Sequence, residues 1–269
     1  MENQTCSPTP ACRSCPSANL VKLGEENQNF DYMIALAGNP NTGKSTVFNA
    51  LTGLRQHTGN WPGKTVTRAE GGFSFDGRQY KIVDLPGTYS LLSASPDEEV
   101  ARDFILFGHP NVTVIVADAT RLERNLNLVL QVLEITDKAV FCVNLIDEAR
   151  RHGISIDAAK LEERLGIPVI LTAARQRKGI HELLQAISDV ASGQRVCRPY
   201  RLQNEPPELK EAIHHLVEKI ERLFPGLPNA RWVALRVLEG DKRMISAIQS
   251  GELRQLYNIP EIAGAGQTT

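Results

Sequence analysis

The sequence predicts an α/β fold: a mostly parallel sheet with helices on both faces, followed by a small all-helical domain. Two observations support this prediction. Between residues 31 and 193, short apolar segments alternate with segments of helical periodicity, and the connections are short. After residue 205, the apolar residues keep only the helical spacing. Strands joined by crossover helices form parallel sheets whose two faces are both covered.

These patterns divide the chain of 269 residues into five parts. A polar leader at 1–30 is rich in Pro, Ser and Asn, and we expect it to be disordered. The α/β domain follows at 31–193, and a linker occupies 194–204. A helical domain at 205–260 and a tail at 261–269 complete the chain. We expect the helical domain to pack on the α/β domain, because it is too short to be very stable alone.

The elements of the α/β domain can be placed by their periodicity. Apolar strands are expected at 32–37, 80–84, 112–117, 139–144 and 168–172. Helices are expected at 44–53, 97–107, 122–136, 157–165 and 180–191. An edge strand around Gly72–Phe75 precedes Asp76-Gly77, which predicts a hairpin into the strand that follows.

The helical domain begins with an amphipathic segment. Residues 208–223 carry an apolar stripe that consists of Leu209, Ile213, Leu216, Val217 and Ile220. Two prolines at 225 and 228 end this helix. Shorter helices are expected at 230–238, 241–249 and 251–257.

A phosphate-binding loop follows the first predicted strand. Residues 38–45 read Gly-Asn-Pro-Asn-Thr-Gly-Lys-Ser, which fits G-x-x-x-x-G-K-S between a strand and a helix start. The glycines allow several N–H groups to point at one anion, and the helix N-terminus adds partial positive charge. In this motif Lys44 reaches the β- and γ-phosphates, and the Ser45 hydroxyl ligates Mg²⁺. The loop predicts a nucleoside triphosphate but not its base.

The base is indicated by Asn144-Leu145-Ile146-Asp147, which follows a later apolar strand. The Asp147 carboxylate can accept hydrogen bonds from both N1–H and the 2-amino group of guanine, a donor pair that adenine lacks. The Asn144 amide can hold the loop and contact the edge of the base. Alone, N-x-x-D is common in turns, but here it lies at a strand end after a phosphate loop.

Two further segments complete the pattern. Asp84-Leu85-Pro86-Gly87 ends a strand and fits D-x-x-G, where an aspartate linked to Mg²⁺ precedes a glycine whose N–H senses the γ-phosphate. Residues 172–174, Thr-Ala-Ala, resemble the loop that supports the guanine from behind. The Asp-Leu-Pro-Gly segment could also be an ordinary turn, and the Thr-Ala-Ala segment is a weak signal alone. The four segments in this order predict a GTPase with the Ras-like P-loop fold.

Composition excludes several other classes. The 30 basic and 31 acidic residues nearly cancel, so we expect no polyanion-binding surface and no nucleic-acid partner. No apolar run approaches the roughly 18–20 residues of a membrane span. The five cysteines do not form a disulfide framework. Cys6, Cys12 and Cys15 lie in the leader, either as exposed thiols or as an incomplete Fe or Zn site that two chains could share.

Longer strings around the motifs resemble one family. Residues 38–53, GNPNTGKSTVFNALTG, then 59–66, GNWPGKTV, and 84–91, DLPGTYSL, resemble the cytosolic region of bacterial ferrous iron transport protein B. The resemblance covers residues 31–260. It implies a GTPase domain, then a helical domain that slows GDP release like a dissociation inhibitor, then a membrane region beyond this chain. We therefore expect a fragment of a longer protein, located at the cytoplasmic face of the bacterial inner membrane.

The resemblance also implies partners and residue roles. The transmembrane iron-permease region is the first partner, and small accessory iron-transport proteins and further copies of the chain are other candidates. By this resemblance, Ser45, Thr65 and Asp84 would ligate Mg²⁺. Thr65 and Gly87 would contact the γ-phosphate. Asn41 matches an asparagine that helps to hold K⁺ in potassium-activated relatives, where the cation neutralises charge as an arginine finger does elsewhere. The expected catalytic residues are Asn41, Lys44, Thr65 and Gly87.

The full set of expected nucleotide-contacting residues combines all of these segments. It consists of Gly38, Asn39, Pro40, Asn41, Thr42, Gly43, Lys44, Ser45, Thr46, Gly63, Lys64, Thr65, Asp84, Gly87, Asn144, Leu145, Asp147, Thr172, Ala173 and Ala174.

Some positions depart from the family pattern. Ala173 replaces a more usual serine, which predicts a looser base-supporting loop and altered GDP release. Thr88 follows the D-x-x-G motif where a glutamine would position the attacking water, so the sequence does not name that residue. We expect Trp61 to lie in an exposed loop as a reporter of nucleotide state, with burial beneath that loop as the alternative.

Three functions fit these residues. The first is a slow GTPase that gates or drives Fe²⁺ uptake through a transporter. The second is a soluble GTPase of ribosome assembly or tRNA modification, which would favour a basic appended domain that 205–258 does not provide. The third is a binding module for metal or partner subunits, with incidental hydrolysis.

Overall fold

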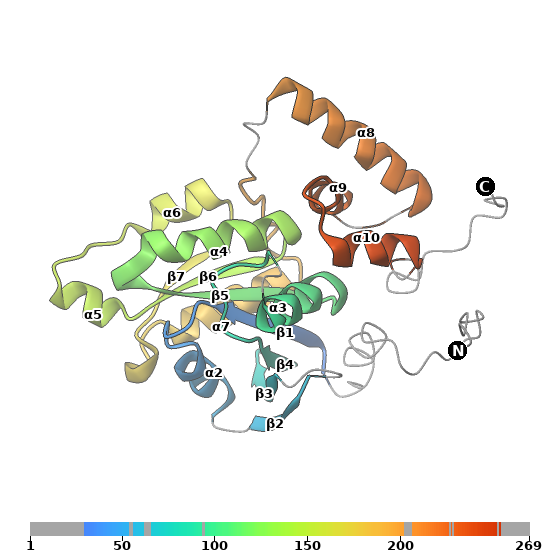
Figure 1. Cartoon of the computed structure of the whole chain (residues 1–269). Helices are drawn as coiled ribbons and strands as arrows, with labels where there is room; N and C mark the ends of the chain where they lie inside the picture. The colour runs from blue at the N-terminus through green and yellow to red at the C-terminus, as the bar shows by residue number, and fades with distance from the viewer. Residues whose placement is uncertain are drawn as a thin grey trace, which may run out of the picture.

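The structure is a computed structural model that describes residues 30–53, 56–61, 66–92, 95–201, 206–225, 227, 229–251 and 253. Its centre is a seven-stranded mixed sheet in the order β2-β3-β4-β1-β5-β6-β7 (Figure 1). The predicted α/β fold is therefore confirmed. Of the predicted leader, only Phe30 lies within the described residues, and Cys6, Cys12 and Cys15 lie outside them.

The five strands of the parallel part of the sheet and the hairpin strand all lie where the sequence predicts them. They are β1 Tyr32–Gly38, β3 Thr67–Phe75, β4 Arg78–Asp84, β5 Val112–Asp118, β6 Ala139–Asn144 and β7 Val169–Leu171. Strands β4, β1, β5, β6 and β7 pair in parallel, so their carboxyl ends meet at one edge of the sheet. Strand β3 pairs antiparallel with β4, as a hairpin requires.

The additional strand β2 Gln56–Asn60 was missed. Its sequence Gln-His-Thr-Gly-Asn has no alternation of apolar and polar residues, so periodicity could not find it. Its antiparallel pairing with β3 defines it as a strand. Tertiary pairing overrides weak local preference here, as is common for edge strands.

Helices cover both faces of the sheet. They are α2 Lys44–Thr52, α3 Pro96–Phe107, α4 Leu122–Ile135, α5 Ile146–Arg151, α6 Ala158–Leu165 and α7 Ile180–Ala191, with single turns η1 Ala119–Arg121 and η2 Ala174–Gln176. Alternate β1 residues separate two cores: Ala35 faces the core that contains α3 and α4, and Ile34 faces the core that contains α2 and α7. Helix α5 was not predicted, because six residues are too few for a clear period.

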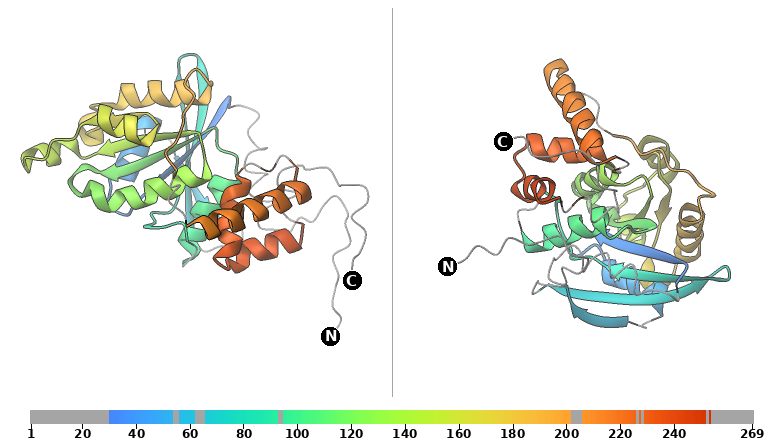
Figure 2. Two further views of the ribbon diagram at one scale, coloured as in Figure 1. Left: turned by 90° about the horizontal axis from the view of Figure 1, so that it is seen from above. Right: turned by 90° about the vertical axis from the view of Figure 1, so that its right-hand side faces the viewer.

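The helical domain consists of α8 Pro207–Leu223, α9 Ala230–Leu238 and α10 Lys242–Gln249. These three predicted helices are confirmed, and the fourth falls mostly outside the described residues. Figures 1 and 2 show the three helices grouped beside α3. Trp232 of α9 and Met244 of α10 belong to the same buried cluster as Phe104 of α3 and Leu128 of α4. The helical domain thus extends one core of the α/β domain.

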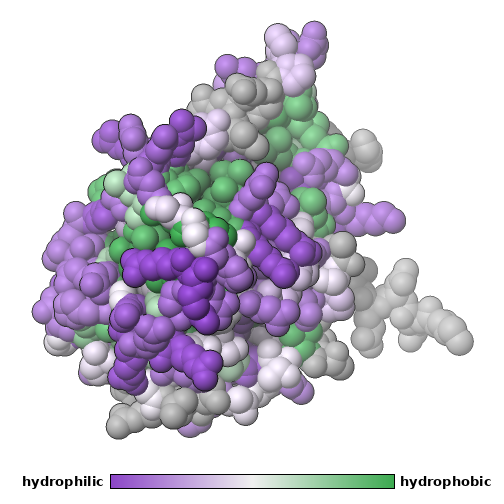
Figure 3. Space-filling model, turned by 90° about the vertical axis from the view of Figure 1, so that its left-hand side faces the viewer, coloured by the Kyte–Doolittle hydropathy of each residue, from purple (hydrophilic) through white to green (hydrophobic). Residues whose placement is uncertain are grey.

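The surface is largely polar. Figure 3 shows hydrophilic side chains over much of one face, with hydrophobic groups between them. Among the helices of the described residues, none is both long enough and apolar enough to cross a membrane.

Candidate nucleotide site

The phosphate loop connects β1 to α2 at the carboxyl edge of the sheet. Gly43 caps α2 with a left-handed φ of 77°. A Cβ atom on Gly43 would lie 2.5 Å from Nδ2 of Asn144, and one on Gly38 would lie 2.6 Å from the Val116 carbonyl oxygen. Both positions therefore require glycine for lack of space, and Gly43 requires it for its backbone conformation as well.

Asn144 joins three of the predicted segments. Its Nδ2 donates to the Thr42 carbonyl oxygen at 3.1 Å. Its Oδ1 accepts from Thr172 Oγ1 and from the Ala174 backbone N–H, both at 3.1 Å. The side chain is almost fully buried. Of the two roles that the sequence allows Asn144, the structure shows the one in which the amide holds the loops together.

Lys44 and Asp84 face each other beneath the loop. Lys44 Nζ forms an ion pair with Asp84 Oδ1 and donates to the Leu85 carbonyl oxygen at 2.6 Å. Burial raises the pKa of Asp84, while the charge of Lys44 and its hydrogen bond oppose that rise. A cation and a buried carboxylate thus lie together where the sequence places the phosphates and the metal.

The D-x-x-G segment lies directly against the phosphate loop. The Thr88 backbone N–H donates to the Gly38 carbonyl oxygen at 3.2 Å, and that of Leu85 donates to the Leu36 carbonyl oxygen at 3.0 Å. A Cβ atom on Gly87 would lie 3.4 Å from Pro40, within ordinary van der Waals contact. Segments that are distant in the sequence therefore form one surface.

The base side of the site is built from two loops. Leu145 adopts a left-handed φ of 62° and caps α5, and the Ile146 N–H donates to the Thr172 carbonyl oxygen at 3.1 Å. Asp147 Oδ2 accepts from Gln176 Nε2 at 2.9 Å. Gln176 was missed by sequence reasoning, because it lies in no motif. Only its position beside the Thr172–Ala174 segment could have suggested it.

The expectation that Trp61 lies in an exposed loop was wrong. Its side chain is only 2% exposed and packs edge-on against Phe104 of α3, with ring centroids 5.3 Å apart. The Arg68 guanidinium lies over the indole at 5.8 Å, and the Trp61 backbone N–H donates to the Val66 carbonyl oxygen at 2.9 Å. Of the two alternatives, burial of the Trp61 side chain is the observed one. The loop residues Gly63, Lys64 and Thr65 lie outside the described residues.

Some polar side chains of the phosphate loop are either exposed or without a partner in the described structure. Both amide atoms of Asn39 are buried in the phosphate loop without a hydrogen-bond partner in the described structure. Such groups are rare in folded proteins and are satisfied by a ligand, an ion or ordered water. Ser45 is exposed in the first turn of α2, and Asn41 is exposed with a φ of 64°. The described part of the chain holds no cluster of three or more His, Cys, Asp or Glu side chains arranged for a metal.

A separate cavity of about 740 Å³ lies between the end of α2 and the edge of the sheet. Lys81, Glu70, Arg177 and Phe73 are among its lining residues, and Lys81 Nζ lies 3.0 Å from Glu70 Oε2. None of the residues in the four motifs lines it. The predicted site is therefore distinct from this cavity.

Comparison with known proteins gives the family of the chain. The model for ferrous iron transport protein B matches residues 32–187, and the model for the FeoB cytosolic helical domain matches residues 206–262. The chain belongs to the ferrous iron transport protein B family. The Fe(2+) transporter FeoB of Shigella flexneri is 41% identical over 229 residues, which cover 82% of this chain. The chain spans 28% of the length of that relative.

Solved FeoB structures have the same fold. The apo form of the Thermotoga maritima FeoB cytosolic domain is 37% identical, with a TM-score of 0.74, and the match covers 87% of this chain and 88% of that one. The GMPPNP form of the same domain is 36% identical, with a TM-score of 0.71, over the same shares of the two chains. The predicted P-loop GTPase fold with an added helical domain is thus confirmed.

Proposed function

We propose that this chain is the GTP-binding and GTP-hydrolysing part of a bacterial ferrous iron transporter, and that its GTP and GDP states gate or drive Fe²⁺ uptake. The observation that carries the proposal is the triple hydrogen bonding of Asn144, which unites the phosphate loop and the base loops in one site. Relatives solved as GDP and GMPPNP forms support a guanine nucleotide. The family match does not favour the RNA-associated alternative.

The phosphate-binding loop and the charged residues beside it would bind the phosphates. Backbone N–H groups of residues 38–46 and the Lys44 ammonium would hold the phosphates. Ser45 and Asp84, with Thr65, would hold Mg²⁺, whose charge stabilises the phosphate oxygens as the bond to the leaving group breaks. Lys44, which pairs with Asp84 in this structure, would bind a phosphate oxygen, and Asp84 would then be available to the cation.

The two loops that Asn144 connects would recognise the guanine base. The Asp147 carboxylate would accept from guanine N1–H and its 2-amino group, while Gln176 fixes its orientation. Leu145 would pack along the base, and residues 172–174 would support it from behind. An adenine nucleotide would leave the carboxylate without its donors, which disfavours ATP.

GTP hydrolysis in this site would depend on how the γ-phosphate and the cations are positioned. The N–H of Gly87 would sense the γ-phosphate, and Asn41 would hold K⁺ beside the phosphates. No arginine of the four motifs provides the charge of an arginine finger, so we expect slow intrinsic turnover and stimulation by K⁺.

The chain would act together with parts that lie outside it. We propose the transmembrane iron-permease region of the longer protein as its main partner, at the cytoplasmic face of the inner membrane. Small accessory iron-transport proteins and further copies of the chain are additional proposed partners. A balanced charge of 30 basic and 31 acidic residues gives no electrostatic basis for a nucleic-acid partner.

Nucleotide competition tests the proposal. Fluorescent GDP and GTP analogues are bound and then displaced with GTP, GDP and ATP, and hydrolysis is measured in KCl and in NaCl. We expect displacement by guanine nucleotides alone and faster turnover in KCl. Guanine binding with equal rates in both salts would remove the role of Asn41, and failure to bind guanine nucleotides would refute the proposed function.

A further inference from the structure

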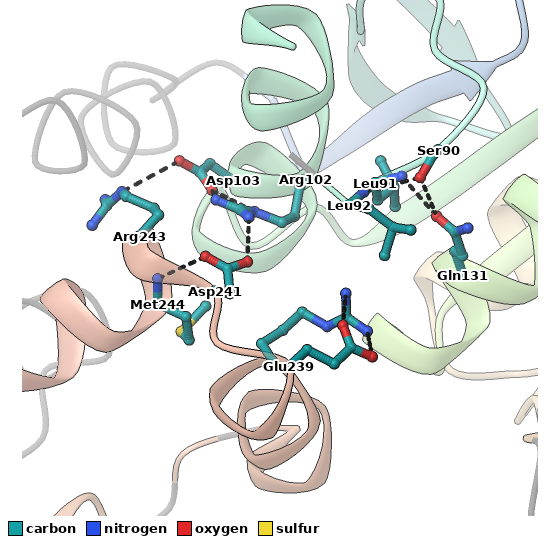
Figure 4. A network of polar contacts seen from close by, with 11 residues as sticks. Ser90, Leu91, Leu92, Arg102, Asp103, Gln131, Glu239, Asp241, Arg243 and Met244 are labelled. Carbon is teal, nitrogen blue, oxygen red and sulfur yellow. Dashed lines mark hydrogen bonds and ion pairs between the residues drawn. The ribbon is translucent and has the colours of Figure 1, made fainter. Parts of the chain in front are cut away.

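Residues 88–92, here called the switch segment, are bound to two different parts of the α/β domain. At one end, Thr88 donates its backbone N–H to the Gly38 carbonyl oxygen of the phosphate loop at 3.2 Å. Further along, the Leu91 N–H donates to Oε1 of Gln131 on α4 at 2.7 Å (Figure 4). A side chain that is neither in a motif nor beside the phosphate loop therefore holds this segment.

Gln131 accepts more than one hydrogen bond. Ser90 Oγ donates to the same Oε1 at 3.3 Å and itself accepts from the Leu92 N–H at 3.1 Å (Figure 4). Nε2 of Gln131 donates to Asn127 Oδ1 at 3.5 Å, one turn earlier on α4. That contact directs the accepting oxygen of the amide towards the switch segment.

A second residue of α4 supports the same segment. The Arg124 guanidinium lies over the ring of Tyr89, 4.5 Å from its centroid. Arg124 and Gln131 are seven residues apart, so they lie two turns apart on the same face of the helix. Tyr89 and Leu91 therefore contact the same face of α4. Tyr89 lies under Arg124, and Leu91 is hydrogen-bonded to Gln131.

The far end of the switch segment reaches the helical domain. Leu92 is 54% exposed and lines a cleft of about 410 Å³. The cleft is also lined by Glu99 of α3 and by residues at the end of α9 and the start of α10, which include Glu239 and Asp241. The segment thus extends from the phosphate loop to the junction between the two domains.

We propose that Gln131 is a positioning residue that fixes the register of the switch segment on α4. A change at Gly87 and Thr88 then reaches Leu92 and the cleft, because the intervening backbone cannot slip along the helix while its bonds to Gln131 persist. The bonded and released arrangements give the segment two discrete states, which coupling between sites requires. This inference rests on the proposed function, which assigns Gly87 to the γ-phosphate.

Two substitutions in the full chain separate hydrogen bonding from shape. Gln131→Leu keeps a similar size and removes the acceptor, while Gln131→Glu keeps accepting oxygens. For Gln131→Leu we expect kcat for GTP to fall roughly three- to tenfold, because the Leu91 N–H loses its acceptor, with KM within about twofold of wild type. Gln131→Glu should stay close to wild type. Ser90→Ala, a milder change, should lower kcat by about twofold.

Amide hydrogen exchange provides a readout that does not depend on turnover. The Leu91 amide should exchange faster in Gln131→Leu and at the wild-type rate in Gln131→Glu. In wild type, we expect exchange at residues 95–101 and 239–244 to differ between the GDP and GMPPNP states, and in Gln131→Leu we expect that difference to shrink at least about threefold. Gln185→Leu, the same change on the exposed face of α7, is the matched control and should alter none of these values.

The outcomes separate this inference from the proposed function. Wild-type protein that neither binds guanine nucleotides nor hydrolyses GTP would refute the proposed function and the coupling together. Wild-type turnover that persists unchanged in Gln131→Leu would refute the role of Gln131 alone. Equal impairment of the Leu and Glu variants would show that hydrogen-bond acceptance is not what matters, and this also overturns the inference.

Discussion

At the scale of single residues, close contact with neighbouring atoms explains why the phosphate loop needs its glycines. The motif alone does not give this reason. The loop pattern requires a glycine at position 43, and the structure gives two independent reasons for it. The φ of Gly43 is 77°, and the amide of Asn144 occupies the space that a side chain would need. Gly53, at the other end of α2, has a φ of 62°, but a Cβ atom added there would meet no neighbour within 4 Å.

These two glycines allow a matched prediction. Gly53→Ala should cost only the left-handed conformation, about 1–2 kcal/mol of unfolding free energy, and leave GDP affinity unchanged. Gly43→Ala should cost more and weaken GDP binding at least about tenfold, because Asn144 must move and release Thr42. Urea unfolding and GDP titration of both variants measure this. Equal loss of affinity in both variants would contradict the argument.

The sequence predicts segments that the structure brings together, but it predicts their contacts only in part. Asn144 could be expected to hold a loop, but its partners Thr42 and Ala174 depend on how distant strand ends meet. The error over Trp61 has a related cause. Its neighbours Asn60 and Pro62 suggest a loop, while Phe104, which buries it, is distant in the sequence.

At the scale of elements, α3 contacts Trp61, which follows β2, on one side and the helical domain on the other. The ring of Phe104 packs edge-on against the indole of Trp61. Arg102, fully buried, pairs with Asp103 at 2.9 Å and with Asp241, the N-cap of α10, also at 2.9 Å (Figure 4). Sequence patterns do not reveal the pair with Asp241, because the two partners are 139 residues apart.

The contact between Trp61, which follows β2, and Phe104 of α3 gives a second prediction. In a double-mutant cycle, Trp61→Ala and Phe104→Ala should each destabilise the protein by roughly 3–5 kcal/mol. Their combined effect should be smaller than the sum by about 0.5–1.5 kcal/mol, the range for edge-to-face aromatic pairs. Thermal or urea unfolding of the four proteins provides the cycle. Strict additivity would mean that the rings do not interact.

The interdomain ion pair gives a pH prediction. Burial by itself would raise the pKa of Asp241, but the Met244 N–H and the Arg102 guanidinium bring it below its ordinary value. A carboxyl with a lowered pKa in the folded state adds stability that is present above its unfolded pKa of about 3.9 and is lost as pH falls through the folded value. Asp241→Asn retains a capping side chain and removes this contribution.

Unfolding free energies of wild type and Asp241→Asn should therefore differ most near neutral pH and converge below about pH 4. The pKa of Asp103 is shifted in the opposite direction. Burial raises its pKa, and Arg102 and Arg243 offset that rise only in part. Its contribution is present at low pH and is lost as pH rises through the folded pKa, so Asp103→Asn should diverge from wild type in the other direction. Parallel pH profiles for all three proteins would contradict both assignments.

At the scale of the whole molecule, the helical domain shares a hydrophobic core with the α/β domain. Trp232, Val233 and Met244 are buried in the cluster that also contains α3 and α4. The short length of the helical domain predicts that it packs on the larger domain. The sequence could not indicate the face, because the stripe on α8 fits any apolar surface.

A shared core predicts cooperative unfolding. The full chain should lose its helical and α/β signals in one transition, and Trp232→Ala should lower the stability of the whole chain by about 3–5 kcal/mol. Denaturant unfolding followed by circular dichroism and by fluorescence tests this. Two separate transitions, with only the helical part affected by Trp232→Ala, would show that the domains unfold independently.

The position of Asn144 between two loops has a consequence for ligand recognition. One amide is bonded at the same time to the segment assigned to the phosphates and to the segment assigned to the base. Ordering one segment thus lowers the entropy cost of ordering the other. GMP should then bind more strongly than the summed binding free energies of guanosine and inorganic phosphate. The excess should be larger than the gain expected from joining two fragments in one molecule. Asn144→Ala should remove that excess, which makes cooperativity within a single ligand a measurable property of one side chain.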